Sequence, residues 1–208
     1  EIRFKVTMAA IYPLPLAAAS SPKGCKYTGQ AVRALPIRII SVGKKRSSGV
    51  QLIIEDYMSK LKPYCKVDDL QLRSNPNNSR LNFRIYNPFL PLSSRTSLSD
   101  ARVQSHDEGA SMMSIITPND LVVVLDEGGM DIDSMQMAEL IGDAANNGRS
   151  RLCFCVGGPY GHGQQMRTRS DQTIKLSSLV LNHEVALVVL MEQLYRAWTI
   201  LKGQNYHH

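Results

Sequence analysis

The chain lacks long apolar stretches. Within its 208 residues, the longest ones are of the size of residues 185–191, far shorter than the roughly 18 residues that a bilayer crossing needs. We therefore expect no membrane span. The hydrophobic content of 43% is nevertheless ordinary for a globular core, and the length fits one domain with an appended segment.

Cysteine is scarce, and the four cysteines do not form a metal-binding or disulfide framework. Cys153 and Cys155 alternate with apolar residues in a run typical of a strand buried on both faces, so we interpret them as inert core thiols in a reducing compartment. Four acidic residues lie close together in the sequence: Asp126, Glu127, Asp131 and Asp133. The sequence has no second cluster that would complete a metal site with them, so we expect no bound metal.

Acidic residues are absent between Ile2 and Ile54, where nine Lys or Arg occur, whereas the remainder carries 15 basic and 17 acidic residues. The net charge of +6 therefore resides in the first quarter and does not by itself indicate an RNA-binding face. Within residues 1–36, the part from Met8 to Pro36 is rich in Ala, Pro, Ser and Lys, as in organellar transit peptides. We expect a chloroplast or mitochondrial leader, or else a disordered basic tail on a cytoplasmic protein.

Strand-like and helix-like patterns alternate over residues 37–208, which predicts an α/β domain with a mostly parallel sheet. Ser134 is expected to cap a helix that Gly148 ends, and Gly128 and Gly129 are expected to take the chain off the sheet. The expected strands are 37–43, 65–72, 121–126, 152–156 and 173–177, and the other expected helices are 50–61, 100–116 and 183–201.

The strand 152–156 runs directly into the glycine-rich segment 157–163. A buried strand that ends at two glycines exposes backbone at the carboxyl edge of the sheet, where open α/β sheets bind ligands. The segment has neither the Lys-Ser/Thr of a phosphate-binding loop nor the spacing of a dinucleotide site. Nucleotide hydrolysis and dinucleotide binding are therefore disfavoured.

Five motifs occur in a fixed order: Val123-Val-Leu-Asp126, Gly157-Gly-Pro-Tyr-Gly-His-Gly163, Leu176-Ser-Ser-Leu-Val-Leu-Asn-His183, Leu194-Tyr-Arg-Ala-Trp198 and Asn205-Tyr-His-His208. This ordered set resembles the RlmH-type family of SPOUT RNA methyltransferases. The resemblance implies a mostly parallel sheet flanked by helices, with a C-terminal trefoil knot that holds S-adenosylmethionine. It also implies a homodimer that methylates N3 of a pseudouridine in 23S-type large-subunit ribosomal RNA.

The same resemblance implies a set of cofactor contacts. Gly157 and Gly158 also fit on physical grounds, because we expect a side chain there to fill the space that a purine needs; the alternative is an ordinary turn between a strand and a helix. Asn182 departs from the proline that the family often has before the histidine, yet it can cap the following helix. The implied contacts are Leu125, Gly157, Gly158, Ser177, Ser178, Leu179, Val180, Leu181 and Asn182.

Candidate catalytic residues are His183, Tyr206 and His207. An imidazole at the position of His183 can accept or relay a proton near neutral pH, although capping or packing would also explain it. Arg196, Tyr206, His207 and His208 are candidate RNA contacts, with a solvated or dimer-facing Arg196 and a purification-tag remnant at the end as the alternatives.

Residues 81–99 have no counterpart in the resemblance and show no period of 2 or 3.6. We expect a surface insertion, with a lid over the site or a splicing artefact as alternatives. A chain that kept the fold but lost turnover would be a catalytically silent ribosome-assembly factor. Retention of every cofactor motif favours the enzyme.

Overall fold

The computed structural model describes residues 24–73 and 98–204. They form a five-stranded sheet in the order β2-β1-β4-β3-β5, and every neighbouring pair is parallel. The strands are β1 (Ile37–Gly43), β2 (Val67–Arg73), β3 (Asp120–Asp131), β4 (Arg151–Val156) and β5 (Gln172–Lys175), and the helices are α1 (Ser48–Leu61), α3 (Leu98–Met113), α4 (Ser134–Asn146), α5 (Gln164–Arg169) and α6 (His183–Leu201). The expected parallel α/β fold is confirmed.

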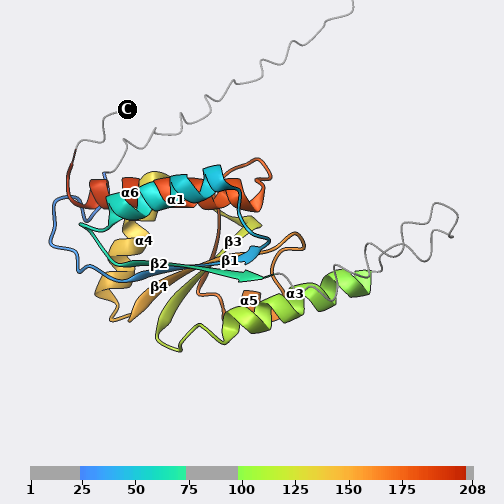
Figure 1. The fold of residues 1–208 in the computed structure, drawn as a ribbon. Coiled ribbons are helices and arrows are strands. Elements are labelled where there is room, and N and C mark those ends of the chain that lie inside the picture. Colours follow the sequence, from blue (N-terminus) through green and yellow to red (C-terminus); the bar gives the residue numbers. More distant parts are fainter. Residues whose placement is uncertain (1–23, 74–97, 205–208) are drawn as a thin grey trace, which may run out of the picture.

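Helices cover both faces of the sheet, with α1 and α6 above it and α3 and α5 below it in Figure 1. The alternation of side chains along β4 explains the two layers, since Leu152 and Phe154 pack toward α1, α4 and α6, while Cys153 and Cys155 pack toward α3 and α5. All four cysteines are buried and free. Burial raises the pKa of the Cys153 thiol to about 12, in keeping with an inert core thiol.

Two local expectations were wrong. Gly128 and Gly129 do not end β3, because the strand continues to Asp131 after a shift of register opposite β5. Ser134 does not cap α4: the carboxylate of Asp133 accepts from the Gln136 backbone, and the Gln136 side chain accepts from the Asp133 backbone. The hydroxyl of Ser134 instead donates to Gln193 on α6.

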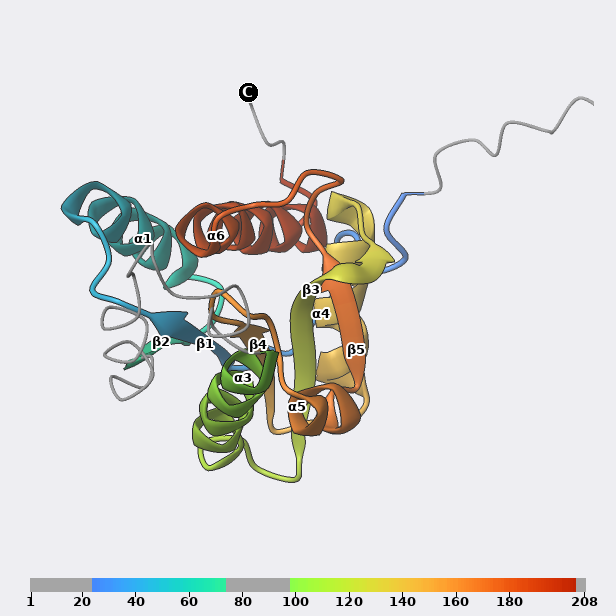
Figure 2. The same ribbon diagram turned by 90° about the vertical axis from the view of Figure 1, so that its right-hand side faces the viewer.

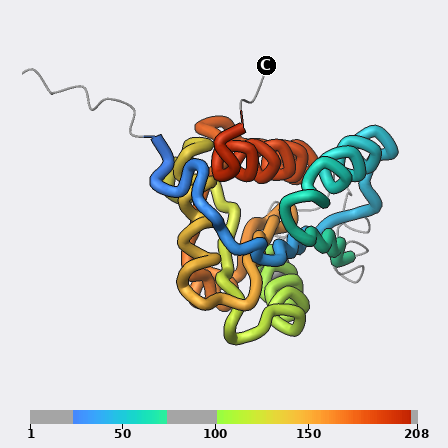
Figure 3. The backbone as a smooth tube through the Cα atoms, turned by 90° about the vertical axis from the view of Figure 1, so that its left-hand side faces the viewer, coloured from blue at the N-terminus to red at the C-terminus, as the bar shows by residue number. Residues whose placement is uncertain are grey.

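The folded domain begins earlier than residue 37, and this corrects the expected boundary of the leader. Residues 24–36 run along α4 and the end of α6 (Figure 3). The Tyr27 hydroxyl donates to Asp143, and a Cβ added to Gly142 would lie 2.2 Å from the Tyr27 ring, so the small residue on α4 accommodates the ring. The Gly29 backbone donates to the carbonyl of Leu201, and Leu35 is fully buried. Residues 1–23 of the expected leader lie outside the described residues, as does the expected insertion up to residue 97.

Replacing Leu35 by Ala should lower the free energy of unfolding by about 2–5 kcal/mol, because the change leaves a cavity in the core. The matched control is Val103→Ala on α3, at a side chain that is 52% exposed, for which we expect at most about 0.5 kcal/mol. Urea unfolding followed by circular dichroism measures both. Equal stabilities for the two variants would place residues 24–36 outside the cooperative unit.

A network of ion pairs closes the amino-terminal edge of the sheet. Asp120, whose side chain is fully buried, accepts from Arg151 at 2.8 Å and from the Thr117 backbone. Burial alone would raise the pKa of Asp120, but these hydrogen bonds outweigh it and hold the pKa below its ordinary value. Asp171, which pairs with Arg149 and Arg169, has its pKa lowered in the same way.

A carboxylate whose folded pKa lies below the unfolded value of about 3.9 stabilises the protein fully above that value. This contribution is lost as the pH falls toward the folded pKa. We therefore expect the free energy of unfolding to fall below about pH 5, and to fall less steeply in Asp120→Asn than in the wild type. A slope unaffected by Asp120→Asn would contradict this assignment.

No helix in the described parts of the chain is long and apolar enough to cross a membrane. The trefoil knot implied by the resemblance stays a prediction.

Candidate functional site

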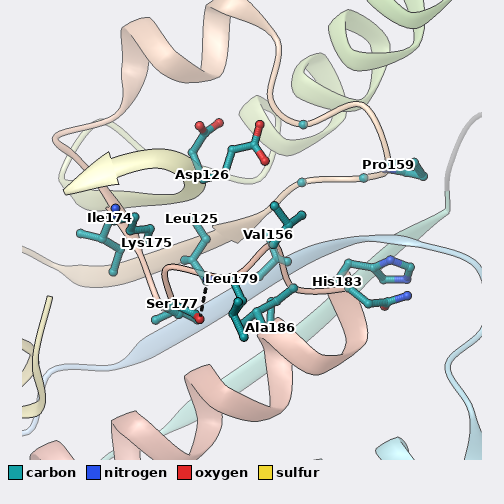
Figure 4. A pocket seen from close by; sticks show the side chains of 18 of the residues that line it. Leu125, Asp126, Val156, Pro159, Ile174, Lys175, Ser177, Leu179, His183 and Ala186 are labelled. Carbon is teal, nitrogen blue, oxygen red and sulfur yellow. Dashed lines mark hydrogen bonds between the residues drawn. The ribbon is translucent and has the colours of Figure 1, made fainter. Parts of the chain in front are cut away.

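A cavity of about 710 Å³ opens at the carboxyl edge of the sheet, beside the ends of β3, β4 and β5 (Figure 4). Its size lies in the range of pockets that hold small-molecule ligands, and its place is the one expected for an open α/β sheet. The walls come from these strand ends, the glycine turn, residues 176–182 and the first turn of α6. The lining residues are Leu125, Asp126, Glu127, Val156, Gly157, Gly158, Pro159, Tyr160, Gly161, Arg167, Ile174, Lys175, Leu176, Ser177, Leu179, Val180, Leu181, Asn182, His183 and Ala186.

The structure thus brings the implied cofactor residues together, with one exception. Ser178 belongs to the same loop but is not among the lining residues. The position of these residues around one cavity agrees with the cofactor site that the resemblance implies. Their contacts with the cofactor stay a prediction.

The glycine turn is held in one shape by its own backbone. The Gly161 N–H donates to the Gly158 carbonyl at 3.0 Å, Pro159 occupies the second position of the turn, and Gly161 has a φ of 69°. The structure shows a further reason for two of the glycines. A Cβ on Gly157 would meet Gly161 and the ring of His162, and a Cβ on Gly158 would lie 2.6 Å from the Glu108 carboxylate on α3. The glycines therefore allow close packing of the turn, while their role in leaving space for a purine stays a prediction.

His162 ties the glycine turn to the end of β3. It is 7% exposed, and its Nε2 lies 3.1 Å from the Leu125 carbonyl, which can only accept, so Nε2 carries the hydrogen. Burial lowers the pKa of His162 and keeps the ring neutral at neutral pH. His162 is the residue before the last glycine of the motif, and the sequence pattern alone did not mark it as a site residue.

The loop 176–182 forms the wall that faces the glycine turn. The Ser177 hydroxyl accepts from the Leu179 backbone at 2.9 Å, as the dashed line in Figure 4 shows. The Asn182 side chain accepts from the Glu184 backbone at 2.9 Å and caps α6, as expected for the residue that replaces proline. Leu179 and Val180 are 75% and 82% exposed. The loop is therefore fixed at both ends and presents apolar side chains between them.

The candidate catalytic and RNA-binding residues lie in different parts of the chain relative to the cavity. His183 is the first residue of α6 and lines the cavity, and its Nε2 lies 3.2 Å from the position that a Cβ on Gly43 would occupy. Arg196 lies outside the cavity and donates to Glu192 one turn earlier. Tyr206, His207 and His208 lie outside the described residues.

Charged side chains complete one side of the cavity. Asp126, just past the last residue of β3 that pairs with β4, forms an ion pair with Arg167 on α5 at 2.7 Å. Lys175 at the end of β5 pairs with Asp131 at 3.1 Å. Glu127 lines the cavity and is exposed. These ion pairs could not be predicted from the sequence, because the spacing along the chain does not reveal the cationic partners of the acidic residues. Among the described residues, no group of three or more His, Cys, Asp or Glu is placed to hold a metal.

Comparison with known sequences agrees with this geometry. A family profile described as "Predicted SPOUT methyltransferase" matches residues 35–207. A predicted RNA methyltransferase of Arabidopsis thaliana is 59% identical over 184 residues, which cover 88% of this chain and 86% of that protein. The ribosomal RNA large subunit methyltransferase H of Christiangramia forsetii is 32% identical over 174 residues, covering 84% of this chain and 99% of that protein.

Among solved structures, the SpoU methyltransferase AviRb of Streptomyces viridochromogenes, in complex with the cofactor AdoMet, has a TM-score of 0.38 and 13% identity. The match covers 79% of this chain and 58% of that chain.

Proposed function

Because this chain belongs to the SPOUT methyltransferase family, we propose that it transfers a methyl group from S-adenosylmethionine to large-subunit ribosomal RNA. The observation that carries the proposal is the cavity of about 710 Å³ at the carboxyl edge of the sheet. Its walls contain eight of the nine residues that the motifs imply for the cofactor.

The cavity fits S-adenosylmethionine in both size and chemistry. Leu125, Leu179 and Leu181 offer apolar surface for the adenine, and the backbone of the glycine turn and of residues 176–182 offers hydrogen-bond donors and acceptors. Asp126 and Glu127 add carboxylates that can accept from hydroxyl or ammonium groups. These residues would hold the cofactor, which supplies an electrophilic methyl group on a sulfonium.

The remaining work of the protein is positioning and proton transfer. In the reaction the acceptor nitrogen forms a bond to the methyl carbon, the carbon–sulfur bond breaks with its electron pair left on sulfur, and the nitrogen loses a proton. His183 lines the cavity where the loop 176–182 meets α6, so its imidazole can take up that proton.

For the acceptor, we propose N3 of a pseudouridine, as the resemblance to the RlmH-type family implies. Residues 55–208 carry a net charge of −2, so we expect recognition on assembled ribosomal particles more readily than on bare RNA. Mass spectrometry of ribosomal RNA from a strain that lacks the protein should show one pseudouridine without its methyl group. Persistence of every methylated pseudouridine, with loss of a methyl group from a transfer RNA, would contradict this substrate.

A homodimer is the proposed assembly. Exposed apolar side chains gather near the starts of α1 and α6, which a hydrogen bond of 3.1 Å between Ser47 and Glu184 brings side by side. We expect Val180→Asp combined with Val185→Asp to give monomers in light scattering at micromolar concentration, and Val103→Asp on α3 to leave the dimer intact. A monomeric and active wild type would contradict the proposal. The exposed residues are Leu52, Ile53, Leu179, Val180 and Val185.

Delivery to a chloroplast or mitochondrion is proposed for the leader, in which residues 2–36 include no acidic residue. Because residues 24–36 belong to the folded domain, we propose that the targeting information precedes residue 24. A fluorescent protein fused to residues 1–23 should enter the organelle. A cytosolic fusion would contradict the proposed address.

A further inference from the structure

The loop between β1 and α1 is anchored by its buried arginine. Arg46 is 8% exposed, and its guanidinium donates to both carboxylate oxygens of Asp69 on β2 and to the Ser41 hydroxyl on β1. The Lys44 carbonyl accepts from the Gln71 side chain at 2.6 Å. The backbone that carries Lys44 and Lys45 is therefore held against the sheet, and both lysine side chains are exposed.

A third exposed cation stands beside this loop. Arg73 ends β2, and the parallel register pairs it with Gly43, the residue before Lys44. We call Lys44, Lys45 and Arg73 the cationic rim. Among the side chains of residues 24–73 and 101–204, no carboxylate forms an ion pair with any of the three. Glu184 on α6 accepts from the backbone and hydroxyl of Ser47, two residues after Lys45.

The cationic rim adjoins the cavity through one contact. Gly43 lies against the imidazole of His183, which lines the cavity, so Lys44 is one residue away from the cavity wall. Figure 2 shows β1, β2 and α1 on one side of this edge and β3 and β5 on the other. The two sides differ in charge. On the β3 and β5 side, Arg167 and Lys175 are neutralised by Asp126 and Asp131, whereas the cationic rim has no such partners in the described structure.

We infer that the cationic rim binds the phosphodiester backbone of the substrate RNA, so that the acceptor base enters the cavity past His183. The inference rests on the proposed function and adds the side from which the RNA approaches. Cations fixed on an anchored loop and left without carboxylate partners suit phosphate binding, because the RNA then breaks no existing ion pair. The inference also assigns a role to part of the positive charge in the first quarter of the chain. Two of the basic residues in the first quarter of the chain lie at the site, although the sequence alone did not assign them to an RNA-binding face.

The test compares two double variants with equal loss of charge. Lys44→Gln with Lys45→Gln removes two cations of the rim. Lys62→Gln with Lys202→Gln removes two exposed cations from the carboxyl ends of α1 and α6, at the opposite end of these helices. Binding of purified bacterial large ribosomal subunits is measured across a series of salt concentrations, together with S-adenosylmethionine affinity by calorimetry and oligomeric state by light scattering.

The rim variant should bind the subunits at least roughly tenfold more weakly near 0.1 M salt, and its salt dependence should be shallower by about 0.7 for each phosphate that it no longer neutralises. Its cofactor affinity and oligomeric state should match those of the wild type, and the Lys62 and Lys202 variant should bind like the wild type. Equal weakening in both double variants, or a weakening accompanied by dissociation of the dimer, would overturn the inference. Because binding is measured without turnover, a wild type that binds the subunits through the rim but transfers no methyl group would refute the proposed function alone.

Discussion

Replacing Ala186 by Phe should abolish S-adenosylmethionine binding, with an affinity loss of more than about 100-fold. Ala186 lies on the first turn of α6, and its methyl group lines the cavity beside Leu179 (Figure 4). A phenyl ring there would occupy volume between the loop 176–182 and the end of β4, and a fixed cavity cannot accept both the ring and a cofactor. Calorimetry with the purified variant measures the loss.

The matched control is Ala110→Phe, which makes the same change at an exposed position of α3, outside the cavity. It should bind the cofactor like the wild type. Both variants should unfold cooperatively at temperatures within a few degrees of the wild type. Wild-type affinity in Ala186→Phe would show that the cofactor binds elsewhere.

Replacing Gly129 by Ala should both destabilise the protein and weaken the cofactor site. A Cβ at Gly129 would lie 2.5 Å from the carbonyl carbon of Ile174 and 2.8 Å from its Cα and nitrogen. These are backbone atoms of β5, so the strand must move, and such overpacking costs about 1–3 kcal/mol or more. Because β5 leads directly into residues 176–182, the displacement should also reach the cavity wall.

Gly49→Ala on α1 is the control for this variant, because nothing lies within 4 Å of the added Cβ. We expect it to keep or slightly raise the stability. Thermal unfolding and cofactor calorimetry on both variants check the difference. A Gly129→Ala protein as stable as Gly49→Ala would contradict the close approach of β3 to β5.

The long C-terminal helix was predicted with the bounds that the structure has, His183–Leu201. Its apolar pattern is long, Asn182 supplies a polar cap at its start, and Gly203 with a φ of 62° follows its end, so local signals agreed with the tertiary contacts. The residues around the cavity were placed mostly by resemblance, since Leu125 and the loop 176–182 are ordinary apolar sequence.

Other features depend on contacts that the local pattern does not carry. Residues 24–36 have no periodicity, yet Tyr27 fits onto Gly142, more than 100 residues later in the chain. The six residues of α5 are too few for a helical period, and this helix was missed. His162 acts through a hydrogen bond to Leu125 across two strands, which only the folded sheet brings together. Helix and strand propensities and the apolar pattern describe one segment at a time. The packing of residues 24–36 and the hydrogen bond of His162 instead depend on contacts between segments that are distant in the sequence.

The central claim is that the cavity between the glycine turn and residues 176–182 holds the methyl donor for ribosomal RNA. The most direct measurement incubates the protein with S-adenosylmethionine labelled in its methyl group and with large ribosomal subunits from cells that lack the corresponding methyltransferase. The account predicts label at one pseudouridine of the large-subunit RNA with the wild type and with Ala110→Phe, and none with Ala186→Phe. Cofactor binding without any transfer to that RNA, or equal transfer by Ala186→Phe, would contradict it.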